Sequence, residues 1–345
     1  MKRVFLSRRD VRYPLMQKNT IYTLKNLGLP AITNLDDLSF LTRISRERIV
    51  LLSTQHKRFY NTFLMPKKSG GHRQISQPSR DLKALQSWIL RNILDKLSAS
   101  KFSKGFEKGS STLDNAIPHI GANYILSLDL EDFFPSIRSG YVFSIFRSIG
   151  YNVHVSHTLT NLCVYNGGLP QGAPTSPKLA NLVCARLDAR ISGYAGKKGI
   201  TYTRYADDIT FSAQTAKKIT KVYSMAKFII HDEKFVINKD KTYFSGTKRN
   251  KRITGLVVTE RSVGIGRVML RSIKAKIHHL LVGKNDDLSH IIGLLSYIYG
   301  VDKKNYKHLI RYIQKLSLKY PNIPQELKDM VAKHNNMAVN TLSEV

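Results

Sequence analysis

Two apolar segments that lead into aspartates constrain the fold more than any other feature of this sequence. The segment Tyr124–Leu130 has the length and composition of a buried strand, and Asp129 stands near its end. Farther along, the apolar runs 200–204 and 209–212 flank Ala206-Asp207-Asp208, which predicts a β-hairpin with both aspartates at its tip. A carboxylate at the end of an apolar strand is costly to bury unless something compensates its charge. We therefore expect an antiparallel sheet that gathers carboxylates at its strand ends.

Taken alone, each aspartate motif has an ordinary alternative. The first is also typical of a charged strand end that opens a loop, and the second of an Asp-rich turn. Adjacent carboxylates repel each other, however, so a tight pair beside apolar strands favours a bound divalent cation. Magnesium prefers a few carboxylate oxygens together with phosphates and water, and two-metal sites hold their ions about 3.5–4 Å apart. Asp129, Asp207 and Asp208, from two neighbouring strands, meet that requirement.

The charge balance points to a polyanionic partner. The chain has 345 residues, with 55 Lys and Arg against 24 Asp and Glu, for a formal charge of +31. Such an excess attracts nucleic acids and speeds their encounter. A merely well-solvated surface is the plainer alternative, and an anionic membrane is a lesser one. The basic residues are spread along the whole chain instead of forming a juxtamembrane tail, which favours nucleic acid.

The sequence predicts a cytoplasmic protein without a membrane segment. Cys163 and Cys184 lie in apolar surroundings, so we expect buried free thiols and no disulfide or zinc site. The basic N-terminus lacks the apolar run of a signal peptide. The longest apolar stretch, Ile291–Val301, is interrupted by glycines and is too short to span a bilayer.

The remaining periodicity predicts a mixture of helices and hairpins. Asn34 and Ser45 look like N-cap residues of short helices within 14–55. The other expected elements are a hairpin over Arg58–Gln77, an amphipathic helix of about four turns over Leu82–Leu97, helices over Tyr141–Gly150 and Leu179–Ile191, a hairpin bracketed by Gly255 and Gly264, and helices from 266 onward. In these last helices we expect Ile273, Ile277 and Leu280 to line one buried face, and Tyr306, Ile310 and Ile313 another.

Three motifs in a fixed order give the sequence a family resemblance. They are LDLEDFFPSI around Asp129, LPQGAPTSP at Leu169–Pro177, and YADD at Tyr205–Asp208. With them the chain resembles the reverse transcriptases, and most closely the retron reverse transcriptases of bacteria. The likeness extends over roughly residues 20–320.

The resemblance implies an α+β right-hand polymerase fold with fingers, a palm built on an antiparallel sheet, and a helical thumb. On this basis we expect an N-terminal helical region at 1–55 and fingers at 56–122. The palm, with a fingers insertion, is expected at 123–258, and an RNA-binding thumb at 259–345.

The resemblance also assigns catalytic roles. It implies that Asp129 and Asp207 coordinate two Mg²⁺ ions, for which Mn²⁺ could substitute, and that Asp208 completes the site. The backbone carbonyl of Leu130 is expected to contact a metal. Phe134 falls at the steric-gate position, where an aromatic ring under the sugar excludes a 2′-hydroxyl. The alternative is that Phe134 belongs to the core, but we assign that place to Phe133, because neighbours in an extended chain face opposite ways.

Further nucleotide contacts are implied by the same resemblance. Gln171 and Gly172 match positions that contact the incoming nucleotide and the template. Arg73, near the basic tip of the first hairpin, lies where the fingers reach the triphosphate, and Lys68 is a weaker candidate. Lys241 resembles the lysine of the family's fourth palm motif. This lysine is expected to protonate the leaving pyrophosphate. An ordinary solvated lysine is the alternative there.

Two motifs are typical of retrons in particular. Asn115-Ala116-Ile117-Pro118-His119 fits the NAxxH pattern, although His119 in isolation would be read as a capping or core histidine. Ile253-Thr254-Gly255 resembles the VTG motif, with Ile in place of Val, and Thr254-Gly255-Leu256 resembles the primer-gripping hairpin. The residues expected to bind RNA or primer are Asn115, His119, Thr254, Gly255, Arg267, Arg271, Lys274 and Lys276.

The resemblance finally implies the partners. Retron enzymes pair with a structured noncoding RNA that is both template and primer, start synthesis from a guanosine 2′-hydroxyl with dNTPs, and leave a branched RNA–DNA product. A separate effector protein and a role in antiphage defence are expected with them. The alternatives are a group II intron-type reverse transcriptase, which usually carries more regions beyond the thumb, and a noncatalytic RNA-binding scaffold on a polymerase fold.

Overall fold

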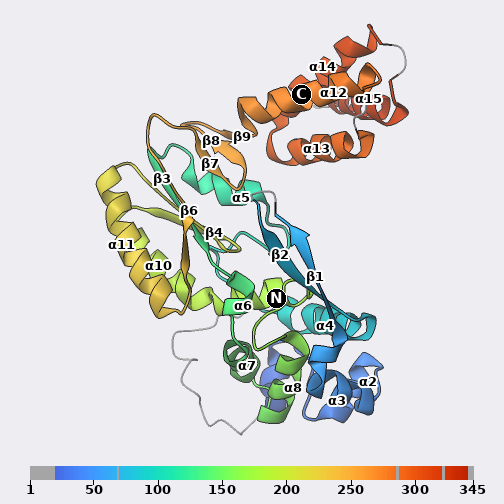
Figure 1. The fold of residues 1–345 in the computed structure, drawn as a ribbon, viewed down its shortest axis with the longest axis vertical. Helices are drawn as coiled ribbons and strands as arrows, with labels where there is room; N and C mark the ends of the chain where they lie inside the picture. The colour runs from blue at the N-terminus through green and yellow to red at the C-terminus, as the bar shows by residue number, and fades with distance from the viewer. Residues whose placement is uncertain (1–19, 68–69, 285–286, 321–322, 341–345) are drawn as a thin grey trace. The chain divides into compact units, whose positions relative to one another are not determined.

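The computed structural model describes residues 20–67, 70–284, 287–320 and 323–340 (Figure 1). It divides into two compact units. Unit 1 comprises the described residues up to Ser110 together with Tyr124–Phe244, and unit 2 comprises Ser111–Asn123 and the described residues from Ser245 onward. This grouping cuts the chain at other points than the expected fingers, palm and thumb, whose boundaries stay predictions.

Unit 1 begins with three short helices, and the second and third start at capping side chains. They are α1 (Thr20–Asn26), α2 (Leu35–Thr42) and α3 (Arg46–Thr54). The side chain of Asn34 accepts a hydrogen bond from the backbone N–H of Asp37 at 2.9 Å, and Ser45 accepts one from Arg48 at 3.3 Å. Each satisfies an N–H that has no partner within its helix, so both predicted N-caps are confirmed.

A two-stranded hairpin and a helix follow a 3₁₀ turn, η1 (His56–Phe59). Strands β1 (Tyr60–Pro66) and β2 (His72–Pro78) pair antiparallel as predicted. Helix α4 (Arg80–Asn92) is shorter than predicted, because the chain changes to a 3₁₀ turn, η2 (Leu94–Lys96). The apolar spacing misled the prediction, since Leu94 and Leu97 are still buried after the α-helical hydrogen bonding ends.

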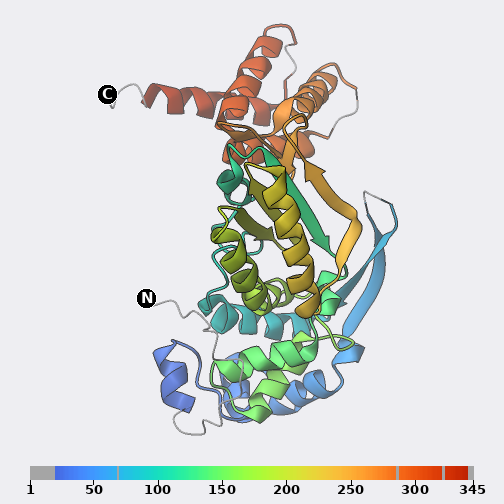
Figure 2. The ribbon, with the colours of Figure 1, turned by 90° about the vertical axis from the view of Figure 1, so that its left-hand side faces the viewer.

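The centre of unit 1 is a four-stranded sheet with strand order β4-β5-β3-β6. Its strands are β3 (Tyr124–Leu130), β4 (Thr201–Tyr205), β5 (Asp208–Ala213) and β6 (Ile237–Ser245). The pairs β3–β5 and β4–β5 are antiparallel, which confirms both the predicted strand and the predicted hairpin. Helices α10 (Ala185–Gly196) and α11 (Ala216–Asp232) pack against each other and against these strands (Figures 1 and 2).

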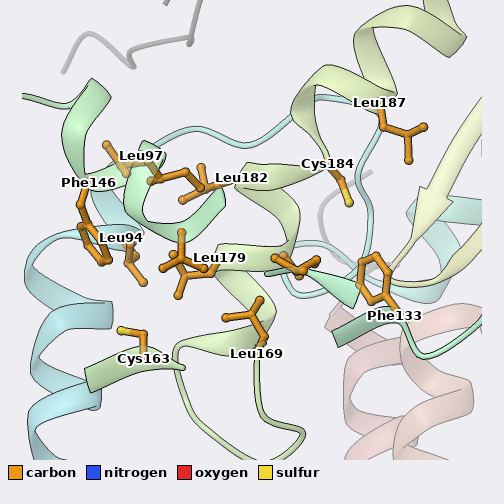
Figure 3. Packing of buried hydrophobic residues seen from close by; sticks show 14 of the residues in the cluster. Leu94, Leu97, Phe133, Phe146, Cys163, Leu169, Leu179, Leu182, Cys184 and Leu187 are labelled. Atoms are coloured by element: carbon orange, nitrogen blue, oxygen red, sulfur yellow. The ribbon is translucent and has the colours of Figure 1, made fainter. Parts of the chain in front are cut away.

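The helices α6 (Phe133–Ser136), α7 (Ser139–Ser148), α8 (Val153–Cys163) and α9 (Ser176–Val183) complete unit 1. The prediction of a single helix over Leu179–Ile191 is wrong. This segment belongs to two helices, α9 and α10, because Cys184 has ψ −3° and interrupts the helical path. The break lets leucines of both helices reach the core, where Leu179 and Leu182 pack near Leu94 and Leu97 (Figure 3). Burial raises the pKa of the thiols of Cys163 and Cys184 to about 12, and both are free, as predicted.

Unit 2 joins a short early segment to the C-terminal part of the chain. The early segment forms α5 (Thr112–Ala116) and the 3₁₀ turn η3 (Ile117–His119), and α5 contacts the strands β7 (Lys251–Ile253) and β8 (Leu256–Val258). These strands and β9 (Val263–Gly264) make a three-stranded sheet, which confirms the hairpin predicted between Gly255 and Gly264. The helices α12 (Gly266–Leu281), α13 (Leu288–Val301), α14 (Lys303–Ser317) and α15 (Gln325–Asn340) follow.

One buried carboxylate ties the sheet of unit 2 to its helices. Asp302 accepts hydrogen bonds from the backbone N–H groups of Ile265, at 3.0 Å, and Asn305, at 3.0 Å. It thereby caps α14 and fixes the chain where α12 begins. Among the described helices, none combines the length and the apolar composition that crossing a bilayer requires.

The predicted buried faces of these helices are largely confirmed. Ile273 and Ile277 are buried in α12, but the third member of the stripe is Leu281 and not Leu280. Steps of four residues along this helix keep the stripe on one side, and Leu280 falls beside it. In α14, Tyr306, Ile310 and Ile313 are buried as predicted.

Candidate active site

The register of the central sheet brings the three aspartates of unit 1 together. Asp129 on β3 lies directly opposite Asp208 on β5. Tyr205 pairs with Asp208 across the β4–β5 hairpin, so Ala206 and Asp207 form its two-residue turn. The backbone N–H of Leu130 donates to the carbonyl oxygen of Asp207 at 3.2 Å, which fixes the turn to the end of β3. A strand end and a hairpin tip distant in sequence thus meet at one edge of the sheet.

Ionisation of Asp207 and Asp208 is disfavoured by desolvation and by neighbouring negative charge. Asp129 is 7% exposed, Asp207 is half-buried, and Asp208 is exposed at the start of β5. Desolvation, and then the charge of Asp129, raises the pKa of Asp207 above its ordinary value. Desolvation, followed by repulsion from Asp207 and Asp129, raises the pKa of Asp208 to about 6. The cluster therefore has an excess of negative charge that a cation would relieve.

One lysine already supplies positive charge to this cluster. Lys241 on β6 places its Nζ 2.8 Å from Oδ1 of Asp129. The hydrogen bond to Asp129 raises the pKa of Lys241 above its ordinary value, so the ammonium form is favoured. Although half of this side chain is exposed, its charged end lies at the carboxylates, unlike that of an ordinary solvated lysine.

The donor set fits a divalent ion by chemistry. Carboxylate oxygens are hard ligands of the kind magnesium prefers, and the raised pKa values of Asp207 and Asp208 reflect first desolvation and then repulsion within the cluster. Over the described part of the chain, no three His, Cys, Asp or Glu side chains are arranged to enclose a metal. In this structure the carboxylate of Asp129 is paired with Lys241 instead.

Phe133 and Phe134 take different positions, though not for the reason we expected. They lie in the helical turn α6, which follows Asp132 with φ 41°, and not in extended chain. Alternation along a strand therefore does not apply. Phe133 is still buried, with its ring centroid 6.0 Å from that of Phe235. Phe134 is partly buried, and its ring centroid lies 6.0 Å from that of the exposed Phe106.

The loop that contains Gln171 and Gly172 is bound to the hairpin that carries Arg73. The backbone N–H of Ser76 on β2 donates to the carbonyl oxygen of Gln171 at 2.8 Å. Gly172 has φ 130°, and a Cβ there would lie 2.9 Å from the carbonyl oxygen of Ser76, so only glycine fits this approach. Arg73 is exposed on β2, and its positive charge offsets a small part of the rise in the pKa of Asp207. Lys68 lies outside the described residues.

Two of the predicted RNA-binding residues of unit 2 are buried. Asn115 and His119 have no exposed surface, and burial lowers the pKa of His119 to about 4, so its ring is neutral at pH 7. In this structure neither side chain is accessible to RNA. Both pack in the segment that supports the β7–β8 hairpin, in agreement with the core alternative for His119.

The other predicted contacts of unit 2 are accessible to different degrees. Thr254, with φ 45°, and Gly255, with φ 84°, form the two-residue turn between β7 and β8; Gly255 is exposed and Thr254 is partly buried. Arg267 and Arg271 are exposed on α12, and Lys276 is partly buried. Lys274 is engaged within unit 2, with its Nζ 2.6 Å from Nε2 of His308 and 5.1 Å from the ring centroid of Tyr312.

The sequence analysis missed two charged residues that lie beneath the Ala206–Asp207 turn. Arg204 and Asp188 form a fully buried ion pair, with Nε of Arg204 2.8 Å from Oδ1 of Asp188. Asn181 bonds to the same guanidinium. A usable signal was present, because Arg204 interrupts an apolar strand directly before the YADD motif, and a charge there needs a partner.

Comparison with known proteins places the chain in a family. Residues 65–258 match the family described as "Reverse transcriptase (RNA-dependent DNA polymerase)". The chain is 53% identical to the Retron Ec86 reverse transcriptase of Escherichia coli, over 88% of this chain and 95% of that protein. It is 33% identical to the Retron Mx65 reverse transcriptase of Myxococcus xanthus, over 84% and 73%. It is also 29% identical to the Retron Ec83 reverse transcriptase of Escherichia coli, over 79% and 90%. The chain therefore belongs to the retron reverse transcriptases, has their α+β polymerase fold, and is an RNA-directed DNA polymerase.

Proposed function

We propose that Asp129, Asp207 and Asp208 bind two Mg²⁺ ions and that this site copies a cognate noncoding RNA into DNA. Reverse transcriptase domains depend on divalent metal ions, and the number and identity of the ions are part of the proposal. The observation that carries it is the sheet register, which sets Asp129 opposite Asp208 and bonds Asp207 to the end of β3. The carbonyl of Leu130, at the same strand end, is a further candidate metal ligand.

Residues of this chain then orient the nucleotide. When bound, the two ions align the attacking hydroxyl with the α-phosphate and stabilise the leaving pyrophosphate. Arg73 holds the triphosphate, and Gln171 and Gly172 position the base pair, supported by the bond from Ser76 to Gln171. Phe134 lies under the sugar and leaves no room for a 2′-hydroxyl. Lys241, already at the carboxylates, donates a proton to the pyrophosphate.

The RNA is gripped by unit 2. The exposed Arg267 and Arg271 contact phosphates of an RNA stem, since RNA helices are recognised mainly through backbone and shape. Lys274 and Lys276 contribute positive charge beside them. The turn Thr254–Gly255 contacts the primer, and Asn115 and His119 support that turn from within.

The retron relatives support the finer assignment of substrate. The cognate RNA is both template and primer, and synthesis starts from a guanosine 2′-hydroxyl to give a branched RNA–DNA product. The enzyme works in the cytoplasm, where its RNA and the dNTPs are found, and acts with a separate effector protein in antiphage defence.

The test uses purified protein with its RNA, dNTPs and Mg²⁺. Asp207→Asn is expected to abolish DNA synthesis while RNA affinity stays unchanged, and Asp36→Asn, on the exposed side of α2, should behave as wild type. A wild-type protein that binds the RNA but makes no DNA on any template would favour the scaffold alternative. Debranching enzyme should release the DNA from its RNA, and resistance to that enzyme would remove 2′-priming from the proposal.

A further inference from the structure

The turn that presents Asp207 has an unfavourable backbone. Ala206 has φ 58°, in the first position of a two-residue hairpin turn, where glycine is normally preferred. A residue with a Cβ stays in this conformation only where its surroundings impose it. The cause must therefore be sought in the atoms that contact Ala206.

A buried guanidinium holds the turn from inside unit 1. Nη1 of Arg204 donates to the carbonyl oxygen of Ala206 at 3.0 Å and to Oδ1 of Asn181 at 3.2 Å. Its Nε and Nη2 donate to the two carboxylate oxygens of Asp188, both at 2.8 Å. The planar group is thus locked by Asp188 on one edge and reaches the turn with the other.

Stability alone does not explain this pair. Both side chains are completely buried, and a buried ion pair is often no more stabilising than apolar residues of the same volume. Asp188 also accepts a hydrogen bond from the hydroxyl of Tyr202 at 2.6 Å, which fixes the carboxylate further. What a hydrophobic replacement would lack is a directed donor for the Ala206 carbonyl.

A second segment, at Gly105, also contacts the turn. A Cβ added to Gly105 would lie 2.7 Å from the backbone nitrogen of Ala206, so the two backbones are in close contact. Asn181 joins both supports, because its Nδ2 donates to the carbonyl oxygen of Gly105 at 2.7 Å while its Oδ1 accepts from Arg204. The hydroxyl of Ser103 also donates to Oδ1 of Asn181, at 2.8 Å.

We propose that Arg204 is a positioning residue for the catalytic carboxylates. By fixing the Ala206 carbonyl against Gly105, it sets the direction in which Asp207 and Asp208 leave the turn. This inference rests on the proposed metal-binding role of those aspartates. It predicts that the buried pair can be replaced without loss of fold, but not without loss of metal affinity.

The decisive variant removes the buried charges together. Tyr202→Phe, Asp188→Leu and Arg204→Met combined leave no lone buried charge or hydroxyl. We expect a folded protein with RNA affinity within about twofold of wild type. We expect kcat for DNA synthesis to fall about 100-fold or more, and the Mn²⁺ affinity of the free protein, from electron paramagnetic resonance of unbound Mn²⁺, to fall about tenfold. Arg204→Lys alone keeps the charge but loses the planar guanidinium. Its kcat and Mn²⁺ affinity should lie between those of the wild type and the triple variant.

A glycine pair tests the same idea without touching the ion pair. Gly105→Ala pushes a Cβ against the backbone of Ala206 and should lower kcat and Mn²⁺ affinity together, by about tenfold or more. Gly140→Ala in α7 is the matched control, because nothing lies within 4 Å of the added Cβ, and it should change neither quantity.

Each outcome decides between two ideas. A folded triple variant, or Gly105→Ala, with normal kcat and normal Mn²⁺ affinity would overturn the positioning role. If the triple variant does not fold, Gly105→Ala and Arg204→Lys decide. Asp207→Asn is measured in parallel, so that synthesis surviving in that variant would count against the proposed function instead.

Discussion

Two hairpins of this molecule turn within two residues, and they support that turn in opposite ways. The β4–β5 turn, Ala206–Asp207, has its positive φ at an alanine and is fixed by a buried guanidinium. The β7–β8 turn has positive φ at both positions, uses glycine at the second, and is bonded by the hydroxyl of Thr254, which donates to the carbonyl oxygen of Thr112 at 3.3 Å. The first turn presents two carboxylates that our proposal requires in one geometry, and its support is a buried charged group; the support of the second is a neutral hydroxyl.

The two turns differ in how many buried polar groups support them. Around Ala206 the backbone conformation is imposed by tertiary contacts, at the cost of burying a charge pair. At Gly255 the positive φ carries no steric penalty, and the strained residue of that turn is Thr254, whose hydroxyl bonds to the carbonyl oxygen of Thr112. The two turns should therefore respond differently to substitution, and the following tests probe that difference.

The largest expected effect comes from unpairing Arg204. Asp188→Asn leaves the guanidinium buried without its counter-charge and should cost about 3–5 kcal/mol of unfolding free energy. The matched control is Asp81→Asn in the exposed pair with Arg48, 2.6 Å apart, which should cost about 1 kcal/mol or less. Urea unfolding measures both. Equal small losses would mean that the buried pair does not support its region.

The next effect tests the chemistry beside the first turn. Phe134→Ala opens space under the sugar and should reduce the preference for deoxynucleotides over ribonucleotides about 100-fold, measured as the ratio of kcat/KM values. Phe40→Ala, on an exposed aromatic ring of unit 1, is the control. Unchanged sugar discrimination in Phe134→Ala would remove the gate assignment.

A smaller effect is expected from the exposed arginines of α12 in unit 2, which we propose bind RNA. Arg267→Glu with Arg271→Glu should lower RNA affinity about tenfold at physiological salt. The slope of log binding constant against log salt concentration should become less steep by about two, with little change in KM for dNTPs. Lys217→Glu with Lys221→Glu, on exposed α11 of unit 1, makes the same charge change elsewhere. An equal loss from both pairs would show that net charge, and not this surface, binds the RNA.

The carboxylate cluster also predicts a pH dependence. The pKa values of Asp207 and Asp208 are raised on folding, that of Asp208 to about 6, so the folded metal-free protein binds more protons than the unfolded chain. Stability from these groups should therefore decrease as the pH rises from about 4 to about 6. Urea unfolding in EDTA should show a weaker decrease in Asp208→Asn. The same slope in both proteins would contradict the raised pKa.

The smallest effect concerns the second turn. Gly255→Ala places a Cβ at φ 84° and should cost about 1 kcal/mol of unfolding free energy. Gly293→Ala, within helix α13 and in open space, should instead stabilise by about 0.5–1 kcal/mol. Thermal unfolding separates the two signs, and a neutral Gly255→Ala would mean that the turn does not need its glycine.

The sequence carried the local part of this structure and not the part that depends on packing. The strand before Asp129 and the hairpin around Asp207 follow from apolar patterning and turn chemistry, which is why their meeting could be expected. The break at Cys184 and the partner of Arg204 could not, because both depend on how α9 and α10 pack under the sheet. Periodicity continued across the break and concealed it.

The burial of Asn115 and His119 was missed for a similar reason. A motif can be typical of a family because it builds a support and not because it contacts the ligand. Phe133 shows the converse, since its place in the core was predicted correctly from an alternation that its helical turn does not have.

The composition of unit 2 affects how this enzyme can be dissected. Ser111–Asn123 belongs with residues beyond Ser245, so the chain passes between the units three times, after Ser110, Asn123 and Phe244. During translation α5 is synthesised long before the β7–β8 hairpin that it contacts. The whole of β3 to β6 must be made first, so α5 lacks this contact until then. A fragment starting at Ser245 would lack this helix, and one ending at Phe244 would expose it. A protease cut near Phe244 alone would leave both pieces joined through α5, so limited digestion should yield a nicked complex that stays together until it is denatured.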